Sequence, residues 1–160
     1  TLNRRGFEET YAAEYARALR SGDVLTVAML DVDDFKLIND RYGHQAGDTA
    51  LKHLSEVLRE TLRPTDAIAR YGGEEFAILL PGVSLSDAAA VMTRVQRELT
   101  RRIFMHNYDK ILMTFSAGVA QIDLQSGLAD ALERADRAMY EAKRTGKNRV
   151  RVADQLSASL

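Results

Sequence analysis

VLTVAMLDV, residues 24–32, is an almost continuous apolar run that ends in acidic residues. A run of this length is typical of a central strand that is covered on both faces. Alternation along such a strand places Asp31 and Asp33 on one face and Val32 on the other. The fold is therefore expected to form around a buried strand with carboxylates at its end.

The segments on either side of this strand carry alternating helical and strand patterns. Helical spacing of apolar residues predicts helices that end near Gly22, cover about 34–42, lie around 50–58, and cover 84–104 and 128–142. Strands are predicted over residues 67–71, 76–80, 111–122 and 148–152. Gly72 and Gly73 lie between two strand patterns and predict a hairpin whose tight turn needs positive φ. This order predicts an α+β fold in which helices pack on a mixed sheet.

Composition limits the function. The 160 residues suit one domain, and 22 Lys+Arg against 23 Asp+Glu give a net charge of −1. No overall field favours a nucleic-acid duplex or an anionic membrane, so we expect neither as a partner, and phosphate binding must be local. Without cysteine, disulfides and thiolate metal sites are excluded. No apolar run approaches the roughly 20 residues of a membrane span.

The acidic run Asp31-Val32-Asp33-Asp34 marks the end of the predicted central strand. Carboxylates in this place can bind Mg²⁺, which prefers oxygen ligands and keeps waters for substrate phosphates. The alternative is a solvated turn in which the aspartates cap the next helix. Both interpretations stay open for this run taken alone.

Asn39 and Asp48 follow and flank glycine breaks. A carboxylate can accept from the N1–H and the exocyclic amine of guanine, and an amide can donate to O6 or N7. Equally, Asn39 can end one helix and Asp48 can support the first turn of the next.

The segment Gly72-Gly73-Glu74-Glu75 has two adjacent glutamates at a predicted hairpin tip, where they repel each other. Glycine would let a planar ligand approach the backbone closely. Glu74 or Glu75 would complete a metal site with Asp31 if the two strands are neighbours. The alternative is a charged turn without function.

Two further segments contain basic residues. Lys143, Arg144, Lys147 and Arg149 surround the end of the last helix, where they can complement the helix dipole or hold a triphosphate. Arg63 and Asp66 form an Arg-x-x-Asp pair, a spacing that chance alone supplies in a chain this charged.

These segments, in this order, resemble the GGDEF family of diguanylate cyclases. The likeness runs from residues 3–5 to residues 146–149. Its blocks are DVDDFKLIND (31–40), GH (43–44), GD (47–48), RYGGEEF (70–76), SAG (116–118) and AD through Y-x-A-K (135–143). Glu74 stands in the accepted Glu-for-Asp form of the signature.

The resemblance implies a nucleotidyl cyclase or polymerase palm-like fold, with a central, mostly antiparallel sheet surrounded by helices. It implies that two GTP are condensed into cyclic di-GMP with Mg²⁺, or Mn²⁺ in its place. The implied metal ligands are Asp31, the Val32 carbonyl and Glu74, and Glu74 or Glu75 assists deprotonation of the attacking 3′-hydroxyl. Substrate would be bound by Asn39 and Asp48 at the base, and by Asp34, Phe35, Lys36, Gly72, Lys143 and Lys147 elsewhere.

The resemblance further implies activity as an antiparallel homodimer and product inhibition at Arg63 and Asp66, with Arg94 as an additional arginine. The N-terminal family motif is cut at Thr1, so we expect residues 1–160 to be one catalytic domain, the C-terminal part of a longer signalling protein with an upstream sensor or receiver domain. We expect this domain to be cytoplasmic, whether or not a membrane sensor tethers it. Two other functions stay open: a module that binds GTP or cyclic di-GMP without turnover, and a cyclase for mixed purine dinucleotides.

Overall fold

The computed structural model describes residues 1–153 and contains a five-stranded sheet in the order β2-β3-β1-β6-β7. The central strand β1 (Leu25–Val32) is antiparallel to β3 (Glu75–Pro81) and to β6 (Phe115–Gln121). At the edges, β2 (Ala67–Arg70) is antiparallel to β3, and β7 (Val150–Val152) is parallel to β6. The expected mixed, mostly antiparallel sheet is therefore confirmed.

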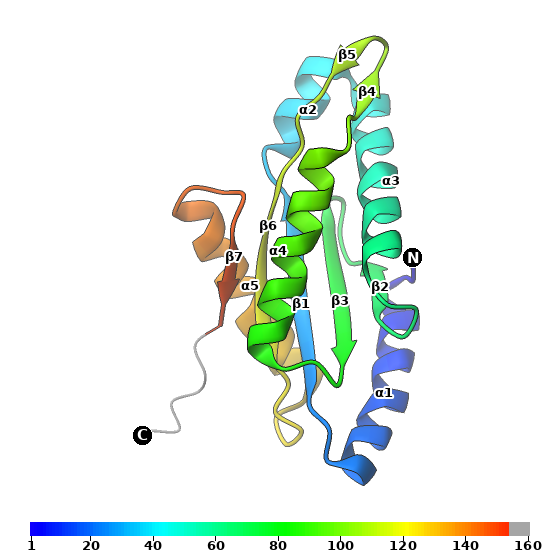
Figure 1. Ribbon diagram of the computed structural model, residues 1–160, viewed down its shortest axis with the longest axis vertical. Coiled ribbons are helices and arrows are strands. Elements are labelled where there is room, and N and C mark those ends of the chain that lie inside the picture. Colours follow the sequence, from blue (N-terminus) through cyan, green and yellow to red (C-terminus); the bar gives the residue numbers. More distant parts are fainter. Residues whose placement is uncertain (154–160) are drawn as a thin grey trace.

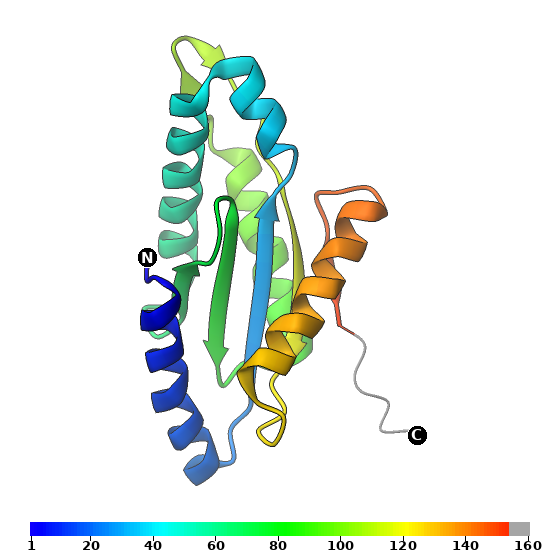
Figure 2. The same cartoon turned by 180° about the vertical axis from the view of Figure 1, so that it is seen from behind.

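Helices cover both faces of this sheet. They are α1 (Arg4–Ser21), α2 (Phe35–Tyr42), α3 (His44–Thr61), α4 (Leu85–Arg101) and α5 (Gly127–Arg144). Figure 1 shows α3 and α4 in front of one face, and Figure 2 shows α1 and α5 on the other. The α+β fold predicted from the order of the segments is confirmed.

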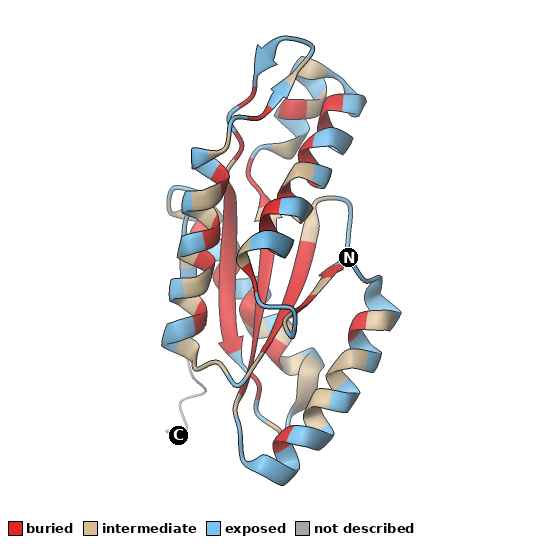
Figure 3. Ribbon diagram, turned by 45° about the vertical axis from the view of Figure 1, so that its right-hand side comes forward, coloured by how far each residue is buried: buried red, intermediate tan, exposed pale blue. Residues whose placement is uncertain are grey.

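The central strand is mostly apolar because each of its faces meets a different layer of helices. Ala28, Leu30 and Val32 belong to the core formed with α3 and α4, whereas Val27 and Met29 belong to the core formed with α1 and α5. Figure 3 shows the buried residues along the sheet and on the inner sides of the helices. Alternation therefore directs Asp31 toward the α1 and α5 side of the sheet.

Gly118 in β6 allows α5 to approach the sheet closely. A Cβ at this position would lie 2.0 Å from the carbonyl oxygen of Ala135 and 2.5 Å from the backbone nitrogen of Met139. These are backbone atoms and cannot rotate away, so only glycine fits. This close approach positions the end of α5 beside the end of β1.

The predicted strand over residues 111–122 is wrong in its first part, because β6 begins only at Phe115. A small hairpin that the sequence did not reveal comes before it, formed by β4 (Met105–His106) and β5 (Asp109–Lys110). Ile111 donates its N–H to the carbonyl of Phe104 at 2.9 Å, so the chain continues the hairpin before it joins the sheet. Apolar pattern alone does not tell these two kinds of pairing apart.

Candidate active site

The end of β1 is brought directly beside the glutamates of the β2–β3 hairpin. Asp31 lies opposite Glu75 on β3 and opposite Ser116 on β6. The Val32 N–H donates to the carbonyl of Glu74 at 3.3 Å. The condition for a joint acidic site, that the two strands are neighbours, is therefore met.

Lys143 on α5 places one positive charge among the oxygens at this strand end. Its Nζ lies 3.0 Å from Asp31 Oδ1 and 3.2 Å from Asp33 Oδ1. The same atom lies 3.4 Å from the Asp31 carbonyl oxygen and 3.3 Å from that of Val32. These oxygens converge on a single cationic atom, so the geometry suits a cation.

The environment of Asp31 opposes its ionisation in part. Burial raises the pKa of Asp31 above its ordinary value, and the charge of Glu74 raises it further, while Lys143 acts in the opposite direction. A cation beside Asp31 would favour the charged form for the same reason as Lys143 does.

Asp33 has a different role from its neighbour. It is 5% exposed, and its carboxylate accepts from Ser116 Oγ at 2.6 Å, from Thr114 Oγ1 at 2.7 Å and from the Asn148 N–H at 2.8 Å. Burial alone would raise the pKa of Asp33, but these hydrogen bonds and Lys143 together hold it below its ordinary value. Asp33 thus ties the end of β1 to β6 and to the turn after α5.

Asp34 stands at the start of α2 in a left-handed conformation, with φ 54°, and its side chain makes no capping hydrogen bond. It instead contacts the ammonium group of Lys147, and this hydrogen bond raises the pKa of Lys147. The alternative of a solvated turn with capping aspartates is therefore wrong for the buried Asp33, whereas Asp34 lies exposed in the turn before α2 but does not cap the helix with its side chain. Phe35 and Lys36 form the first turn of α2, half-buried and exposed respectively.

Asn39 and Asp48 are brought together by the packing of α2 on α3. A Cβ at Gly47 would lie 1.9 Å from Asn39 Oδ1, so the Asn39 amide occupies the space that a side chain at 47 would need. Asp48 is the next residue along α3 and is exposed. The alternative roles at helix ends are wrong, because Asn39 lies inside α2 and Asp48 lies beyond the first turn of α3.

The hairpin tip has an open loop rather than the predicted tight turn. Tyr71 N–H donates to the Glu75 carbonyl at 2.9 Å, and the Arg70 guanidinium donates to the Gly73 carbonyl at 2.5 Å. Gly72 and Gly73 do not adopt positive φ, so the expected reason for the glycines is wrong. A Cβ at Gly73 would meet nothing within 4 Å, which leaves the backbone open to a ligand.

Glu75 lies close to further carboxylates on the neighbouring strand and on α5. Burial raises the pKa of Glu75, and the charges of Asp136, Asp31 and Glu74 raise it further, whereas Arg4 lowers it. Burial also raises the pKa of Asp136 on α5. Sequence reasoning gave Asp136 no role, although its helical spacing of seven residues from Lys143 places both on the same side of α5.

Arg63, Asp66 and Arg94 lie at the other end of the sheet. The Asp66 side chain is 2% exposed and accepts from Arg63 Nη2 at 2.8 Å, and Arg63 also donates to the carbonyl of Pro81 at 2.9 Å. This hydrogen bond with Asp66 raises the pKa of Arg63. Arg94 donates to the carbonyl of Thr61 at 3.2 Å. The three residues are thus near one another, and β3 separates them from the glutamates.

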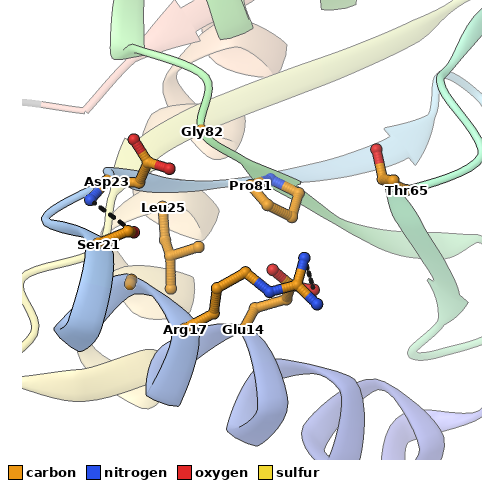
Figure 4. A pocket seen from close by; sticks show the side chains of 9 residues that line it. Glu14, Arg17, Ser21, Asp23, Leu25, Thr65, Pro81 and Gly82 are labelled. Carbon is orange, nitrogen blue, oxygen red and sulfur yellow. Dashed lines mark hydrogen bonds and ion pairs between the residues drawn. The ribbon is translucent and has the colours of Figure 1, made fainter.

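A cavity of about 170 Å³ borders this second group of residues rather than the acidic strand ends. Figure 4 shows Thr65 and Pro81 on one side of it and Glu14 and Arg17 of α1 on the other. Leu25 at the start of β1 also lines the cavity, and it pairs with Pro81 in the sheet. The cavity therefore lies at the opposite end of β1 from Asp31.

The chain is similar to known proteins over nearly its whole length. The chain matches the family described as "Diguanylate cyclase, GGDEF domain" over residues 2–149. It belongs to this family. The GGDEF chain is 41% identical to diguanylate cyclase DgcP from Pseudomonas aeruginosa over 94% of its own length, but it spans only 22% of that relative.

Solved GGDEF structures have the same fold. The GGDEF domain of DgcB from Caulobacter crescentus, in complex with c-di-GMP, superposes with a TM-score of 0.89 at 33% identity, over 96% of this chain and 91% of that one. The active GGEEF domain of a diguanylate cyclase from Vibrio cholerae superposes with a TM-score of 0.80 at 30% identity, over 96% and 98%. The signature variant of this chain is thus found in a domain described as active.

Two features are absent from the part of the chain that the structure describes. Within residues 1–153, no three or more His, Asp or Glu side chains form a cluster that would hold a metal ion by themselves. The expected metal site is consistent with this result, since it combines two carboxylates with a backbone carbonyl. In the same part of the chain, no helix combines the length and the apolar character that crossing a membrane requires.

Proposed function

We propose that this GGDEF chain is a diguanylate cyclase that condenses two GTP into cyclic di-GMP and two pyrophosphates. The observation that carries the proposal is the convergence of the Asp31 and Val32 oxygens on one cationic atom, beside the Glu74–Glu75 strand end. The names of the relatives agree with this activity.

Mg²⁺, or Mn²⁺ in its place, would be held by Asp31, the Val32 carbonyl and Glu74. The oxygen set fits, because carboxylate and carbonyl oxygens are the ligands that these hard cations prefer, and the Lys143 ammonium already lies beside the Asp31 and Val32 oxygens. When bound, the ion supplies positive charge to the phosphoryl oxygens of the substrate.

The guanine base would be read by Asn39 and Asp48. The exposed Asp48 carboxylate accepts from the N1–H and the 2-amino group, and the Asn39 amide, fixed against Gly47, donates to O6 or N7. Adenine lacks the N1–H and the 2-amino group, so this pair favours GTP over ATP.

The triphosphate would lie between α2 and the end of α5. Backbone at Asp34 and Phe35 and the exposed Lys36 face it from the start of α2. Lys143 and Lys147 supply point charges from the other side and exchange their carboxylate partners for phosphate. Gly72 lets the ligand approach the hairpin backbone.

In the reaction, the 3′-oxygen of one GTP forms a bond to the α-phosphorus of the other. The bond from that phosphorus to the bridging oxygen breaks, and pyrophosphate leaves. Glu75 or Glu74 takes the proton of the 3′-hydroxyl. A second, identical transfer closes the ring. Because each site holds one GTP, two chains face each other as an antiparallel homodimer, and the protein contributes mainly by orienting the two nucleotides.

Cyclic di-GMP, the product, would inhibit the cyclase by binding at Arg63 and Asp66, with Arg94 as a further donor. Asp66 is buried and holds the Arg63 guanidinium as a fork, which suits bidentate recognition of phosphate and of the guanine edge. The distance from the acidic site along β3 makes this a second, separate binding site. We also propose that the chain is one cytoplasmic domain of a longer signalling protein with an upstream sensor or receiver, since it spans 22% of DgcP.

The test is incubation with GTP and Mg²⁺ at high protein concentration, with products resolved by mass spectrometry. We expect cyclic di-GMP from the wild type and none from Glu74→Ala. The same pair is repeated with a dimerising coiled coil fused to the chain, because activity needs two copies. If the fused wild type binds GTP or cyclic di-GMP but makes no product, the chain is a binding module and the proposal is wrong.

A further inference from the structure

The first residues of the chain pack directly on the hairpin that carries the two glutamates. Leu2 N–H donates to the carbonyl of Ile68 at 2.8 Å, and Arg70 N–H donates to the carbonyl of Leu2 at 3.0 Å. Leu2 thereby forms a parallel bridge with Ala69 at the outer edge of β2. The start of the chain is therefore fixed to the strand that leads into the hairpin tip.

Tyr71, the first residue of the tip, is held from two sides by α1. The Arg4 guanidinium carbon lies 4.6 Å from the centroid of the Tyr71 ring, and Arg4 Nη2 donates to the Tyr71 carbonyl at 3.5 Å. The ring of Phe7, which is fully buried, meets the same ring edge-on, with centroids 5.6 Å apart. We call these three side chains the Tyr71 clamp.

The clamp adds to the contacts that Arg70 makes with the Gly73 carbonyl and Val32 with the Glu74 carbonyl, and it acts on a tip with little side-chain packing of its own. Tyr71 is followed by two glycines, which bring no side chain to pack and which allow more backbone conformations than other residues do. The Gly72 N–H reaches the Glu75 carbonyl only at 3.5 Å. A fixed Tyr71 therefore limits where the backbone of Glu74 and Glu75 can lie.

We propose that Arg4 and Phe7 are positioning residues, which hold Tyr71 and through it set the location of Glu74 and Glu75 at the acidic site. This inference rests on the proposed cyclase function. It gives α1 a role in the reaction although α1 contributes no group to the substrate. Arg4 is exposed, so its replacement leaves the core intact.

The experiment compares Arg4→Ala with Arg5→Ala, the adjacent exposed arginine, which among the described residues has neither an ion pair nor a ring partner. Hydrogen exchange of residues 71–75 is measured beside exchange of β1, and kcat and KM for GTP are measured on the same samples. We expect Arg4→Ala to speed exchange at the tip but not in β1. We expect kcat to fall roughly two- to fivefold, the factor that an exposed cation–π contact supports, with KM unchanged because α2 and α3 read the base.

Conservative variants separate positioning from simple structural support. Tyr71→Phe keeps the ring and is expected to match the wild type, whereas Tyr71→Leu is expected to match Arg4→Ala. If Arg4→Ala and Arg5→Ala give equal exchange at the tip, or if exchange rises equally in β1, the proposal is overturned. Exchange is measured without substrate, so it decides on the clamp even if the coiled-coil fusion shows no turnover, the result that would refute the cyclase function.

Discussion

Replacing Gly47 by alanine tests whether Asn39 reads the base. The new Cβ would lie 1.9 Å from Asn39 Oδ1 and 2.9 Å from its Cγ, so the amide must rotate away. The main clash is with the end of a flexible side chain, and the Phe35 Cζ at 3.1 Å must shift by only a few tenths of an ångström. Inside a helix, alanine is more favourable than glycine by about 1 kcal/mol. We therefore expect the variant to be folded and at least as stable as the wild type.

The cost is expected in nucleotide binding. A neutral hydrogen bond from the Asn39 amide to O6 or N7 contributes about 0.5–1.5 kcal/mol, which corresponds to a roughly two- to tenfold weaker binding of GTP once it is lost. Inosine triphosphate keeps O6 and N7 and lacks only the 2-amino group that Asp48 would read. Gly47→Ala should therefore weaken the binding of both nucleotides by the same factor. Asp48→Ala should instead reduce the preference for GTP over inosine triphosphate.

The assay is calorimetric titration of both nucleotides into wild type, Gly47→Ala, Asn39→Ala, the double variant of these two and Asp48→Ala, with urea unfolding as a check on the fold. If Asn39 is the group displaced, the double variant binds like Asn39→Ala alone. Unchanged binding in Gly47→Ala, or an equal further loss in the Asn39→Ala background, would refute the reasoning.

Three further predictions concern other parts of the chain. Arg63→Ala loses the guanidinium fork, so the product concentration that halves the initial rate should rise about tenfold or more; an unchanged value would contradict the feedback site. Burial lowers the pKa of His53, so the unfolded chain binds its proton more readily, and stability should fall as pH drops below the unfolded pKa of about 6.5. The free energy of unfolding in urea is measured at pH 7.5 and at pH 5. Its drop between the two pH values should be smaller for His53→Leu than for the wild type and for the exposed control His44→Gln; equal drops would contradict this. Asp33→Asn removes a buried, hydrogen-bonded charge and should lower the free energy of unfolding by about 3 kcal/mol, unlike Asp34→Asn on the surface; similar urea midpoints would contradict the role of Asp33.

The main elements were predictable because each has a strong local signal. The apolar run of β1 and the helical spacing in α3 and α4 leave little choice of structure. The β4–β5 hairpin was missed because its strands have two residues each and its turn uses Asn107 and Tyr108 at positive φ instead of glycine. Tyrosine in that conformation is uncommon, so no turn signal marked the hairpin.

The site was predictable only in part, since side-chain partners depend on packing between distant segments. Pattern allowed Asp31 and the glutamates to form one site only if their strands are neighbours, and the register of β1 with β3 meets this condition. Nothing in the sequence indicated that the Arg4 guanidinium lies on the Tyr71 ring, 67 residues away. Glycine at 47 was seen as a helix break, whereas it is a buried helical residue against which Asn39 packs.

In the run Asp31-Val32-Asp33-Asp34, the most buried carboxylate is not the one that we propose as the metal ligand. Asp33 is the more buried, yet its oxygens are already satisfied by hydroxyl, backbone and ammonium donors. Asp31 has Lys143 as its one side-chain partner in the described chain, so its carboxylate retains capacity to accept another cation. Because β1 ends at Val32, Asp34 turns outward to Lys147. The free capacity to accept, and not the depth of burial, therefore distinguishes the proposed metal ligand from its structural neighbours.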